Sequence, residues 1–487
     1  MDKRTKIVAT VSDQRCDPTF LTQLFDAGVN VVRLNSAHMD KTGFDLVVDN
    51  VRTASPEIAI LVDTKGAEVR TTKCEGELFL CKGDPITVKA DPELPSRKEC
   101  ISVNYPFFVR DVPVGSRILI DDGEVALLVL DKNESELHCR VENDGTISSR
   151  KSINVPDVHL ELPAVSKRDQ QFMLYAIERG VAFIAHSFVR SRSDVEEVRQ
   201  FLDEHGGQSF KIISKIENQE GVDNIDDIID ASYGIMIARG DLGIEIDMER
   251  IPALQQMMVH RCILKKKPVI VATQMLHTMI HSPRPTRAEV SDVSSAIMMN
   301  TDAVMLSGET AYGKYPVEAV TTMSRIIKEA ERHQQNRDDI KAKKGENDIM
   351  NVTSFLAKQT VKAVCKLGVK AIITDVAQGR CARNLSAYRG EAPIYAICRD
   401  HIVARQLNLS YGIFPFYQKQ KGQSRREYYV QSIQRLLQAG YIGEDDLIAY
   451  VGGTLSEELG TTSLELTRPK DILEYYNKVL DSKDICE

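Results

Sequence analysis

The sequence has little that would tie it to a membrane or to an oxidising compartment. No apolar run approaches the ~18 residues of a membrane span, and the chain does not start with a basic-then-apolar leader. The ten cysteines are scattered and include no Cys-x-x-Cys pair, which argues against a disulfide framework or a zinc site. Tryptophan is also absent, but its absence excludes nothing. We therefore expect a cytoplasmic protein with reduced thiols and no membrane partner.

Two further classes of protein are disfavoured. The net charge of −8 argues against a general affinity for nucleic acid, although a local basic pocket for a phosphate remains compatible with it. No Gly-x-x-x-x-Gly-Lys-Ser/Thr loop and no protein-kinase loop occurs, so neither common kinase scaffold applies. The chain has 487 residues, 43% of them hydrophobic and 27% charged, which is typical of a soluble protein with two to four domains.

Eight short apolar runs recur along the chain with helical stretches between them. Runs that are apolar throughout, rather than alternating, are typical of strands buried on both faces. All but one of the gaps between them fit a βα unit, so the pattern predicts an α/β fold of the (β/α)8, or TIM, barrel type. The runs are Lys6–Val11, Val29–Asn35, Ile58–Thr64, Phe183–Arg190, Phe210–Glu217, Tyr233–Asp241, Pro268–Gln274 and Asp302–Thr310.

The one long gap predicts a domain inserted after the third strand. Residues 67–160 contain alternating runs broken by turn signals such as Asp121-Asp-Gly and Asn143-Asp-Gly, which is typical of a small antiparallel β-barrel. Attached at the carboxyl end of a barrel strand, this domain would form a lid over the barrel mouth. The catalytic barrel itself is then expected to comprise residues 1–66 and 161–331.

Residues 332–487 predict a separate C-terminal α/β domain with a role in regulation or assembly. A charge-dense stretch from Ala330 to Asp348 favours a solvated helix and a linker. Beyond it, helical patterns alternate with strand-like runs, which are Ala371–Thr374, Ile394–Ala396, Leu447–Val451 and Leu464–Leu466.

Polar side chains stand at the carboxyl ends of the predicted strands, where (β/α)8 enzymes carry their chemistry. A terminal Thr or Asn alone is more often a helix N-cap than a ligand, and a lone Lys/Glu pair is more often a surface ion pair. Such groups at seven of the eight strand ends favour a functional site instead. They are Arg33 and Asn35, Asp63 with Thr64 and Lys65, Arg190, Lys215 with Glu217, Asp241, Thr273 with Gln274, and Ser307 with Glu309.

These groups divide by charge. Glu217 and Asp241 end successive strands, and neighbouring strands lie about 4.8 Å apart, so both carboxylates can hold one Mg²⁺. Lys215, Arg33 and Arg70 suit a phosphoryl group. A site with cations and a metal but without an activated nucleophile matches phosphoryl transfer. The residues alone therefore predict a metal-assisted enzyme that acts on a small phosphorylated acid.

Nine short motifs follow one another along the chain. They are Lys6-Ile-Val-Ala-Thr10, Val32-Arg-Leu-Asn35, Asp63-Thr-Lys-Gly66, Leu162-Pro-Ala-Val-Ser166, Ile213-Ser-Lys-Ile-Glu-Asn218, Ala238-Arg-Gly-Asp-Leu-Gly243, Ala272-Thr-Gln-Met-Leu276, His281-Ser-Pro-Arg-Pro-Thr-Arg-Ala-Glu289 and Met305-Leu-Ser-Gly-Glu-Thr310. In this order they resemble the motifs of pyruvate kinases, over essentially the whole chain. The resemblance implies the barrel, the inserted lid and the C-terminal domain. It also implies transfer of phosphate from phosphoenolpyruvate to ADP, which gives ATP and enolpyruvate that is then protonated to pyruvate.

The resemblance assigns roles to the charged groups at the strand ends. By position, Glu217 and Asp241 hold Mg²⁺ or Mn²⁺. Lys215 neutralises the phosphoryl group in flight, and Arg33 contacts phosphates. These residues form the centre of the expected catalytic set.

The resemblance places the remaining catalytic groups around the organic part of the substrate. Thr273 and the backbone of Gly240 and Asp241 hold the substrate carboxylate, and the latter two begin a short predicted helix whose free N–H groups suit an anion. Ser307, with Glu309 behind it, belongs to the network that delivers the proton. The sequence does not decide which group protonates the enolate.

A monovalent cation site is the next expectation. Asn35, Asp63 and Thr64 offer oxygen ligands for K⁺. The family's Asn-Phe-Ser-His segment has Ala37 at its serine, so one hydroxyl ligand is missing, and the neighbouring serine or a water would take its place. Glu68 is nevertheless the residue that marks potassium-dependent members of the family, so we expect K⁺ dependence.

The resemblance also gives partners. Arg33, His38, Arg70, Lys151 and Asn154 fall where the family contacts the nucleotide, ADP or ATP. A homotetramer is expected. The effector loop of the family usually reads Thr-x-Ser-Gly-Arg-Ser, and here it reads Val-Ala-Gln-Gly-Arg-Cys from position 376, with Glu457 and Glu458 in the other loop of that site. Control by fructose 1,6-bisphosphate is therefore not expected.

Two rival interpretations remain open at this point. A metal-dependent aldolase or lyase of pyruvate or phosphoenolpyruvate could use the same barrel, although it would not need the lid and the C-terminal domain. A degenerate pseudokinase retained for binding would be expected to lack Lys215 or one of the two metal-binding acids, and all three are present.

Overall fold

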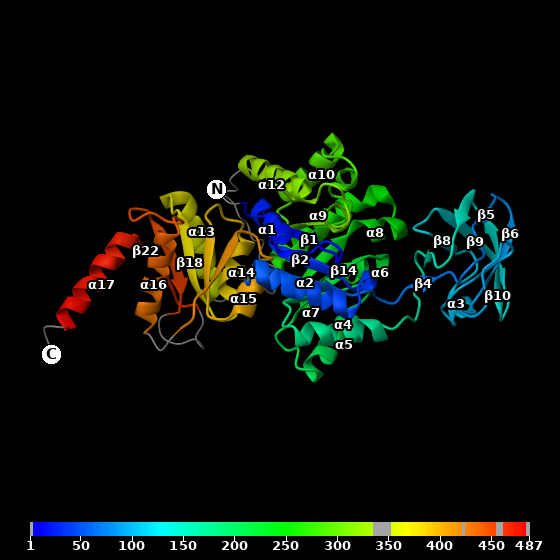
Figure 1. Cartoon of the computed structure of the whole chain (residues 1–487), viewed down its shortest axis with the longest axis horizontal. Coiled ribbons are helices and arrows are strands. Elements are labelled where there is room, and N and C mark those ends of the chain that lie inside the picture. Colours follow the sequence, from blue (N-terminus) through cyan, green and yellow to red (C-terminus); the bar gives the residue numbers. More distant parts are fainter. Residues whose placement is uncertain (1–2, 335–351, 421–423, 454–460, 484–487) are drawn as a thin grey trace.

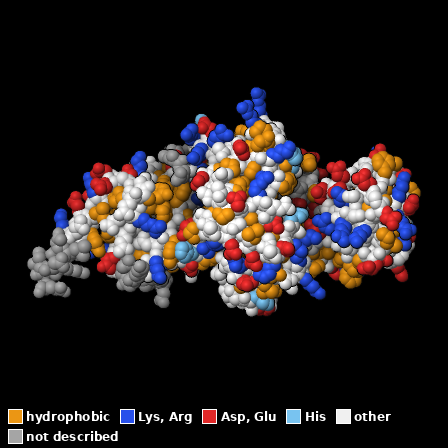
Figure 2. All heavy atoms as spheres, in the orientation of Figure 1, with side chains coloured by type: hydrophobic (Ala, Val, Ile, Leu, Met, Phe, Trp, Pro, Cys, Tyr) orange, Lys and Arg blue, Asp and Glu red, His pale blue; other side chains and the backbone are white. Residues whose placement is uncertain are grey.

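The computed structural model describes residues 3–334, 352–420, 424–453 and 461–483. Three bodies lie along the long axis of the molecule (Figure 1). A barrel occupies the middle, a small β-rich domain lies at one end, and an α/β domain from the C-terminal part of the chain lies at the other. Within the described ranges, no helix is long and apolar enough to cross a membrane. On the face shown in Figure 2, acidic and basic side chains are interspersed over all three bodies.

The central body is a closed barrel of eight parallel strands, which confirms the predicted fold class. The order around the barrel is β1-β17-β16-β15-β14-β13-β3-β2. Its strands are β1 (Lys6–Thr10), β2 (Val31–Asn35), β3 (Ala59–Asp63), β13 (Phe183–His186), β14 (Lys211–Ile216), β15 (Gly234–Ala238), β16 (Val269–Ala272) and β17 (Ala303–Leu306). The surrounding helices are α1 (Pro18–Ala27), η1 (Ser36–His38), α2 (Lys41–Ala54), α4 (Lys167–Glu178), α5 (Arg192–Glu204), α6 (Gln219–Asp223), α7 (Ile225–Ala231), α8 (Arg239–Glu245), η2 (Met248–Arg250), α9 (Ile251–Leu264), η3 (His277–Ile280), α10 (Arg287–Met298), α11 (Gly308–Ala311) and α12 (Pro316–His333).

Alternation along each strand decides which side chains enter the barrel. Leu61 and Ile213 belong to a buried cluster formed by residues of the barrel strands. Their neighbours Ile60 and Ile212 belong to a second cluster, which also contains helix residues such as Phe44. Because successive residues of a strand point to opposite faces, every second residue of a barrel strand faces the interior.

Several strands end earlier than predicted. The run Phe183–Arg190 forms a strand only as far as His186, because Phe188 has a φ of 54°, which a strand does not accommodate. The run Asp302–Thr310 ends as a strand at Leu306, and α11 follows at once. The shorter strands change which residues stand at the carboxyl rim of the barrel.

The inserted domain is a curled β-sheet. Its main sheet has the order β4-β12-β8-β9-β10-β6-β7, and β11 pairs with β5. Backbone bonds from Thr72 N to Ser102 O (2.9 Å) and from Asn104 N to Arg70 O (3.0 Å) join the two outer strands. All pairs are antiparallel, as predicted, except β6 with β7. The elements are β4 (Val69–Arg70), β5 (Leu78–Leu80), β6 (Pro85–Lys89), β7 (Cys100–Ser102), α3 (Phe108–Asp111), β8 (Arg117–Ile120), β9 (Val125–Lys132), β10 (Glu136–Val141), β11 (Gly145–Ile147) and β12 (Ser152–Asn154).

The C-terminal body is the expected α/β domain, with the sheet order β20-β19-β18-β21-β22. Only β22 runs antiparallel to its neighbour. The elements are α13 (Val352–Leu367), β18 (Ala371–Val376), α14 (Arg380–Ala387), β19 (Ile394–Cys398), α15 (His401–Leu407), β20 (Ile413–Tyr417), α16 (Arg425–Gln438), β21 (Ile448–Gly452), β22 (Ser463–Thr467) and α17 (Pro469–Lys483). Of the predicted helix and linker from Ala330 to Asp348, α12 covers the start and residues from 335 onward lie outside the described ranges.

The C-terminal domain packs against the amino ends of the barrel strands. Lys6 Nζ, at the start of β1, donates a hydrogen bond to Ile413 O at 2.5 Å. Arg389 forms an ion pair of 2.6 Å with Asp302, which directly precedes β17. The inserted domain leaves the barrel after β3, at the opposite, carboxyl rim. The lid and the C-terminal domain therefore lie at opposite ends of the barrel, as Figure 1 shows.

Candidate active site

Strand alternation brings charged side chains together inside the carboxyl rim of the barrel. Asp63 and Lys215 each lie two residues beyond an interior apolar residue, Leu61 and Ile213 respectively. They therefore point into the same space. Arg33 reaches this space from β2, where its Nε donates to Asp63 Oδ2 at 2.6 Å and its Nη1 to Thr10 Oγ1 at 3.0 Å.

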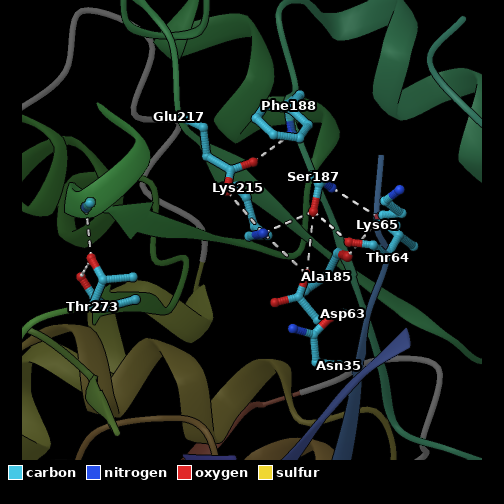
Figure 3. Close-up of polar contacts among 12 residues, drawn as sticks. Asn35, Asp63, Thr64, Lys65, Ala185, Ser187, Phe188, Lys215, Glu217 and Thr273 are labelled. Carbon is cyan, nitrogen blue, oxygen red and sulfur yellow. Dashed lines mark hydrogen bonds and ion pairs between the residues drawn. The ribbon is translucent and has the colours of Figure 1, made fainter. Parts of the chain in front are cut away.

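Lys215 is the centre of a buried polar network (Figure 3). Its Nζ lies 2.9 Å from Glu217 Oε1 and 3.2 Å from Asp63 Oδ1. It also donates a hydrogen bond of 2.8 Å to Ser187 Oγ. Burial alone would lower the pKa of Lys215, but the two carboxylates that contact it, together with that of Asp241, outweigh burial and raise the pKa above its ordinary value. The ammonium group is therefore charged and fixed in position.

Asp63 pairs with both Lys215 and Arg33 in this network. Burial would raise the pKa of its carboxyl, but Arg33 and Lys215 more than offset burial and hold the pKa below its ordinary range. The buried carboxylate therefore balances the two cations, one on each side. A buried charge is tolerated only when it is paired in this way.

The two acids proposed from sequence as metal ligands follow two neighbouring strands of the barrel, β14 and β15. Glu217 follows β14, is almost fully buried, and accepts a 2.6 Å hydrogen bond from Phe188 N. Asp241 lies in the first turn of α8. Burial raises the pKa of Glu217, Lys215 opposes the increase, and the nearby carboxylate of Asp241 adds to it. The buried carboxylate of Glu217 therefore lies close enough to that of Asp241, which is half-buried, for the two to repel each other.

Ser187 was missed by the sequence analysis. It follows the last residue of β13, and its hydroxyl donates to Thr64 O at 2.6 Å while it accepts from Lys215. It also lies 3.3 Å from Asp63 Oδ1. The early end of β13 makes Ser187, rather than Arg190, the polar group at this strand end. Its position directly after a buried run was the available signal.

Thr273 and Gly240 are in contact in the structure. Gly240 N donates to Thr273 Oγ1 at 2.7 Å, and the same hydroxyl donates to Ala272 O at 2.7 Å. Thr273 and Gln274 both have positive φ angles, 69° and 55°. Residues in the left-handed region persist only where the surroundings hold them. The sequence analysis counted the Gly240 N–H as free for an anion, whereas Thr273 occupies it here.

Glu309 holds two loops of the rim together. One carboxylate oxygen accepts from Ser307 N at 2.8 Å, and the other accepts from Leu276 N at 3.1 Å. Ser307 is half-buried, and Glu309 is buried behind it. Glu309 therefore orients the backbone that carries the Ser307 hydroxyl, and its link to Leu276 was not foreseen.

The three oxygens expected around K⁺ occupy adjacent strands. Asn35 and Asp63 lie opposite each other in the register of β2 and β3. Asn35 Oδ1 accepts from Ala37 N at 3.1 Å and so caps η1. Thr64 Oγ1 accepts from Ser187 N at 3.1 Å and lies 3.2 Å from Ala185 O.

The nucleotide set is only partly assembled. Arg70 lies on the edge strand β4 of the lid and Lys151 directly precedes β12, the strand paired with it; Arg70 contacts Glu68 at 2.7 Å and Lys151 contacts Asp121 at 2.7 Å. The exposed His38 lies in η1 of the barrel, and Arg33 lies inside the rim. Asn154 joins the lid to the barrel, because its Nδ2 donates to Glu245 Oε1 on α8 at 3.1 Å.

Comparison with known proteins identifies the family. A family model described as the barrel domain of pyruvate kinase matches residues 2–320, and one described as the alpha/beta domain of pyruvate kinase matches residues 355–465. The chain belongs to the pyruvate kinase family. A pyruvate kinase of Borreliella burgdorferi is 43% identical over 98% of this chain and 100% of its own length. One of Clostridium acetobutylicum is 40% identical over 95% of this chain and 98% of its own.

Comparison with solved structures gives the same family as the sequence comparisons. A solved structure of a pyruvate kinase from Cryptosporidium parvum matches with a TM-score of 0.91 and 34% identity, over 96% of each chain. The pyruvate kinase family is a family of phosphotransferases, and that is the activity of this chain. Neither the aldolase or lyase interpretation nor the pseudokinase interpretation has support among these relatives.

Proposed function

We propose that this chain transfers the phosphoryl group of phosphoenolpyruvate to ADP and releases pyruvate and ATP. The main support for this proposal is the position of Lys215. Its ammonium group is buried between Asp63 and Glu217, inside the rim of the barrel, and Arg33 enters the same space. Such a fixed cation is matched to a phosphoryl group whose negative charge is spread over three oxygens during transfer. Preorganised charge of this kind requires no rearrangement at the moment of reaction.

Glu217 and Asp241 are the proposed ligands of Mg²⁺ or Mn²⁺. Their electrostatic environment fits a divalent ion. Burial and the Asp241 carboxylate raise the pKa of Glu217, and the positive charge of a bound ion would offset both effects. Mg²⁺ is commonly held by one or two carboxylates, with the rest of its shell from water and substrate phosphates. When bound, the ion supplies positive charge that neutralises the phosphoryl oxygens.

Arg33 binds the phosphate end of the phosphorylated acid, and Thr273 with Gly240 and Asp241 binds its carboxylate end. Arg33 is oriented by Asp63 and Thr10, and no partner of its Nη2 lies within the described residues, so this group is available to a phosphate oxygen. On the other side, the substrate carboxylate takes the N–H groups of Gly240 and Asp241 and the hydroxyl of Thr273. The bond between Gly240 N and Thr273 Oγ1 then opens for the ligand.

Ser307 is the proposed hydroxyl in the path that delivers a proton to the enolate. Glu309 holds the Ser307 backbone through its N–H and so fixes where the hydroxyl can point. Glu309 is accordingly a positioning residue rather than the acid itself.

K⁺ is the proposed monovalent cation, with Asn35, Asp63 and Thr64 as ligands. The register pairing of Asn35 with Asp63 supports a shared site, since their side chains start from adjacent strands. Ala37 supplies no hydroxyl, so binding of the ion is expected to be weaker than in relatives with a serine there.

The nucleotide lies between barrel and lid in this proposal, against Arg33, His38, Arg70, Lys151 and Asn154. The hydrogen bond from Asn154 to Glu245 supports it, because it shows that this edge of the lid reaches the barrel.

The remaining parts of the proposal concern the whole molecule. The chain divides into a catalytic barrel (1–66 and 161–331), a lid (67–160) and a C-terminal domain for regulation or assembly (332–487). We further propose a cytoplasmic homotetramer.

A coupled assay tests this function directly. Purified protein receives phosphoenolpyruvate, ADP and Mg²⁺, with or without K⁺, and pyruvate is followed with lactate dehydrogenase. The Asp241→Ala variant should fold and lose turnover at ordinary Mg²⁺, since one carboxylate does not hold the ion against its water shell. Asp247→Ala, an exposed acid just beyond α8, is the matched control and should retain activity. Near-normal activity of Asp241→Ala would refute the metal assignment.

A further inference from the structure

One short loop touches the catalytic network and both connections between barrel and lid. The loop runs from Ser187 to Arg190, between β13 and α5. At its start, Ser187 accepts from Lys215 and Phe188 N donates to Glu217. This end therefore holds the catalytic lysine and a proposed metal ligand.

The outgoing connection to the lid packs against the middle of the loop. Ser187 Oγ donates to Thr64 O at 2.6 Å, just beyond β3. A Cβ on Gly66 would lie 2.6 Å from Cδ2 of the Phe188 ring, and Gly66 has a φ of 76°, so only glycine fits this crossing. Phe188 itself has a φ of 54°, and such strain in a non-glycine residue is typical of functional loops.

The returning connection is held by the end of the loop. Arg190 donates from Nη1 to Leu160 O and from Nη2 to Leu162 O, both at 3.0 Å. Asp194 on α5 orients the guanidinium through contacts of 3.2 Å to Nε and Nη2. The side chains of Leu160 and Leu162 pack against the hydrophobic core of the lid. Arg190 is a barrel residue, and it therefore fixes the backbone of two residues whose side chains pack against the lid.

The contact between Arg190 and the returning connection is not tightly packed on all sides. A cavity of about 470 Å³ lies beside it, lined among others by Leu162, Arg190 and Asp194. The side chain of Arg190 is 18% exposed and that of Asp194 is 10% exposed. Hydrogen bonds to a charged donor are stronger than neutral ones, and more so away from water. The returning connection thus has space to move. Arg190 attaches it to the barrel from a mostly buried position, and the more exposed contact of His159 with Glu220 at 2.9 Å attaches it a second time.

We infer that Arg190 is a positioning residue that sets the orientation of the lid relative to Lys215 and Glu217. It acts through the backbone of Leu160 and Leu162 and does not touch the reacting atoms. The inference rests on the proposed function. In that function the lid contributes nucleotide contacts, whereas the phosphoenolpyruvate groups belong to the barrel. Loss of Arg190 should therefore act on the nucleotide more than on phosphoenolpyruvate.

The test compares Arg190→Met with Arg192→Met, in full-length protein. Arg192 is two residues away, 57% exposed, and paired along its own helix with Glu196, so it is the matched control. Hydrogen exchange of the backbone amides of residues 157–162, which lie between two prolines, is measured first, without substrates. Arg190→Met should exchange there about tenfold faster than wild type, as expected for the loss of charge-assisted bonds. Arg192→Met should match the wild type.

Steady-state kinetics supply the second readout. In Arg190→Met, kcat/KM for ADP should fall about tenfold or more, while the KM for phosphoenolpyruvate changes much less. Arg190→Lys, which can reach one carbonyl as a point charge, should be intermediate. Unchanged exchange at residues 157–162, or equal shifts in both KM values, would overturn the inference. An inactive wild type would instead contradict the proposed function, and the exchange comparison would still decide whether Arg190 restrains the lid.

Discussion

Replacement of Lys215 by methionine is the sharpest test of the catalytic network. Methionine keeps much of the volume of the side chain and removes its charge. The loss should appear in kcat, because the ammonium group is held in a fixed position by Glu217, Asp63 and Ser187 and so acts chiefly on charge that develops during transfer. Groups of this kind contribute about 3 kcal/mol to transition-state stabilisation, so kcat should fall by about 10² or more.

The same change should alter stability in a pH-dependent way. Removing one partner of a buried ion pair costs about 3–5 kcal/mol when the other charge stays buried. Without Lys215, the pKa of Glu217 should rise further above its ordinary 4.5, because only burial and Asp241 still act on it strongly. The folded state would then hold a proton that the unfolded state releases. The variant should therefore lose stability as the pH rises from 4.5 through the folded pKa.

The measurement combines the lactate dehydrogenase assay with thermal unfolding between pH 5 and 8. Lys211→Met is the matched control, because Lys211 begins the same strand, β14, at the end away from the rim. It should keep its kcat. If Lys215→Met raised only the KM for substrates and left kcat unchanged, the assignment of Lys215 to the transition state would be refuted.

Three further predictions concern the monovalent cation, acid stability and the effector loop. Glu68→Lys, which places a fixed ammonium group in the mouth of the site, should reduce the dependence of activity on K⁺ in a titration with KCl; an unchanged K⁺ requirement would contradict the role given to Glu68. Burial lowers the pKa of His186 to about 4, so the unfolded protein binds a proton between pH 6.5 and 4 that the folded protein does not. His186→Gln should therefore remove a stability loss of about 2 kcal/mol that the wild type suffers between pH 7.5 and 5; urea midpoints that fall equally in both proteins would exclude His186 as the cause. Fructose 1,6-bisphosphate should barely move the substrate saturation curve, because Val376, Gln378 and Cys381 stand at the hydroxyl positions of the family loop, whereas a several-fold shift would show that other residues build an effector site.

The fold was predictable where burial leaves a strong local pattern. All eight barrel strands were predicted from continuous apolar runs, because a strand that is covered on both faces carries apolar side chains on both faces. The lid followed from the single gap too long for a βα unit. The strand β20 was not predicted, since Ile413–Tyr417 contains Pro415 and lies at the edge of its sheet, where a missing N–H is tolerated.

The charged members of the site were predictable for a different reason. Lys215, Glu217 and Asp241 follow buried runs, and carboxyl strand ends meet at one rim. The links between them were not predictable. The contact of Ser187 with Lys215 depends on the early end of β13, which in turn follows from the left-handed backbone of Phe188. No propensity scale assigns such a conformation to phenylalanine, because it is set by tertiary contacts.

The polar groups of the site pair with one another. Gly240 N is paired with Thr273, and Glu217 with Lys215 and the N–H of Phe188. Unpaired buried charges would destabilise the barrel, so this internal pairing stabilises the folded protein. Each ligand must then exchange an existing bond for a new one. Binding energy is consequently smaller than a count of ligand contacts suggests, and the charge on Lys215 stays available for the transition state.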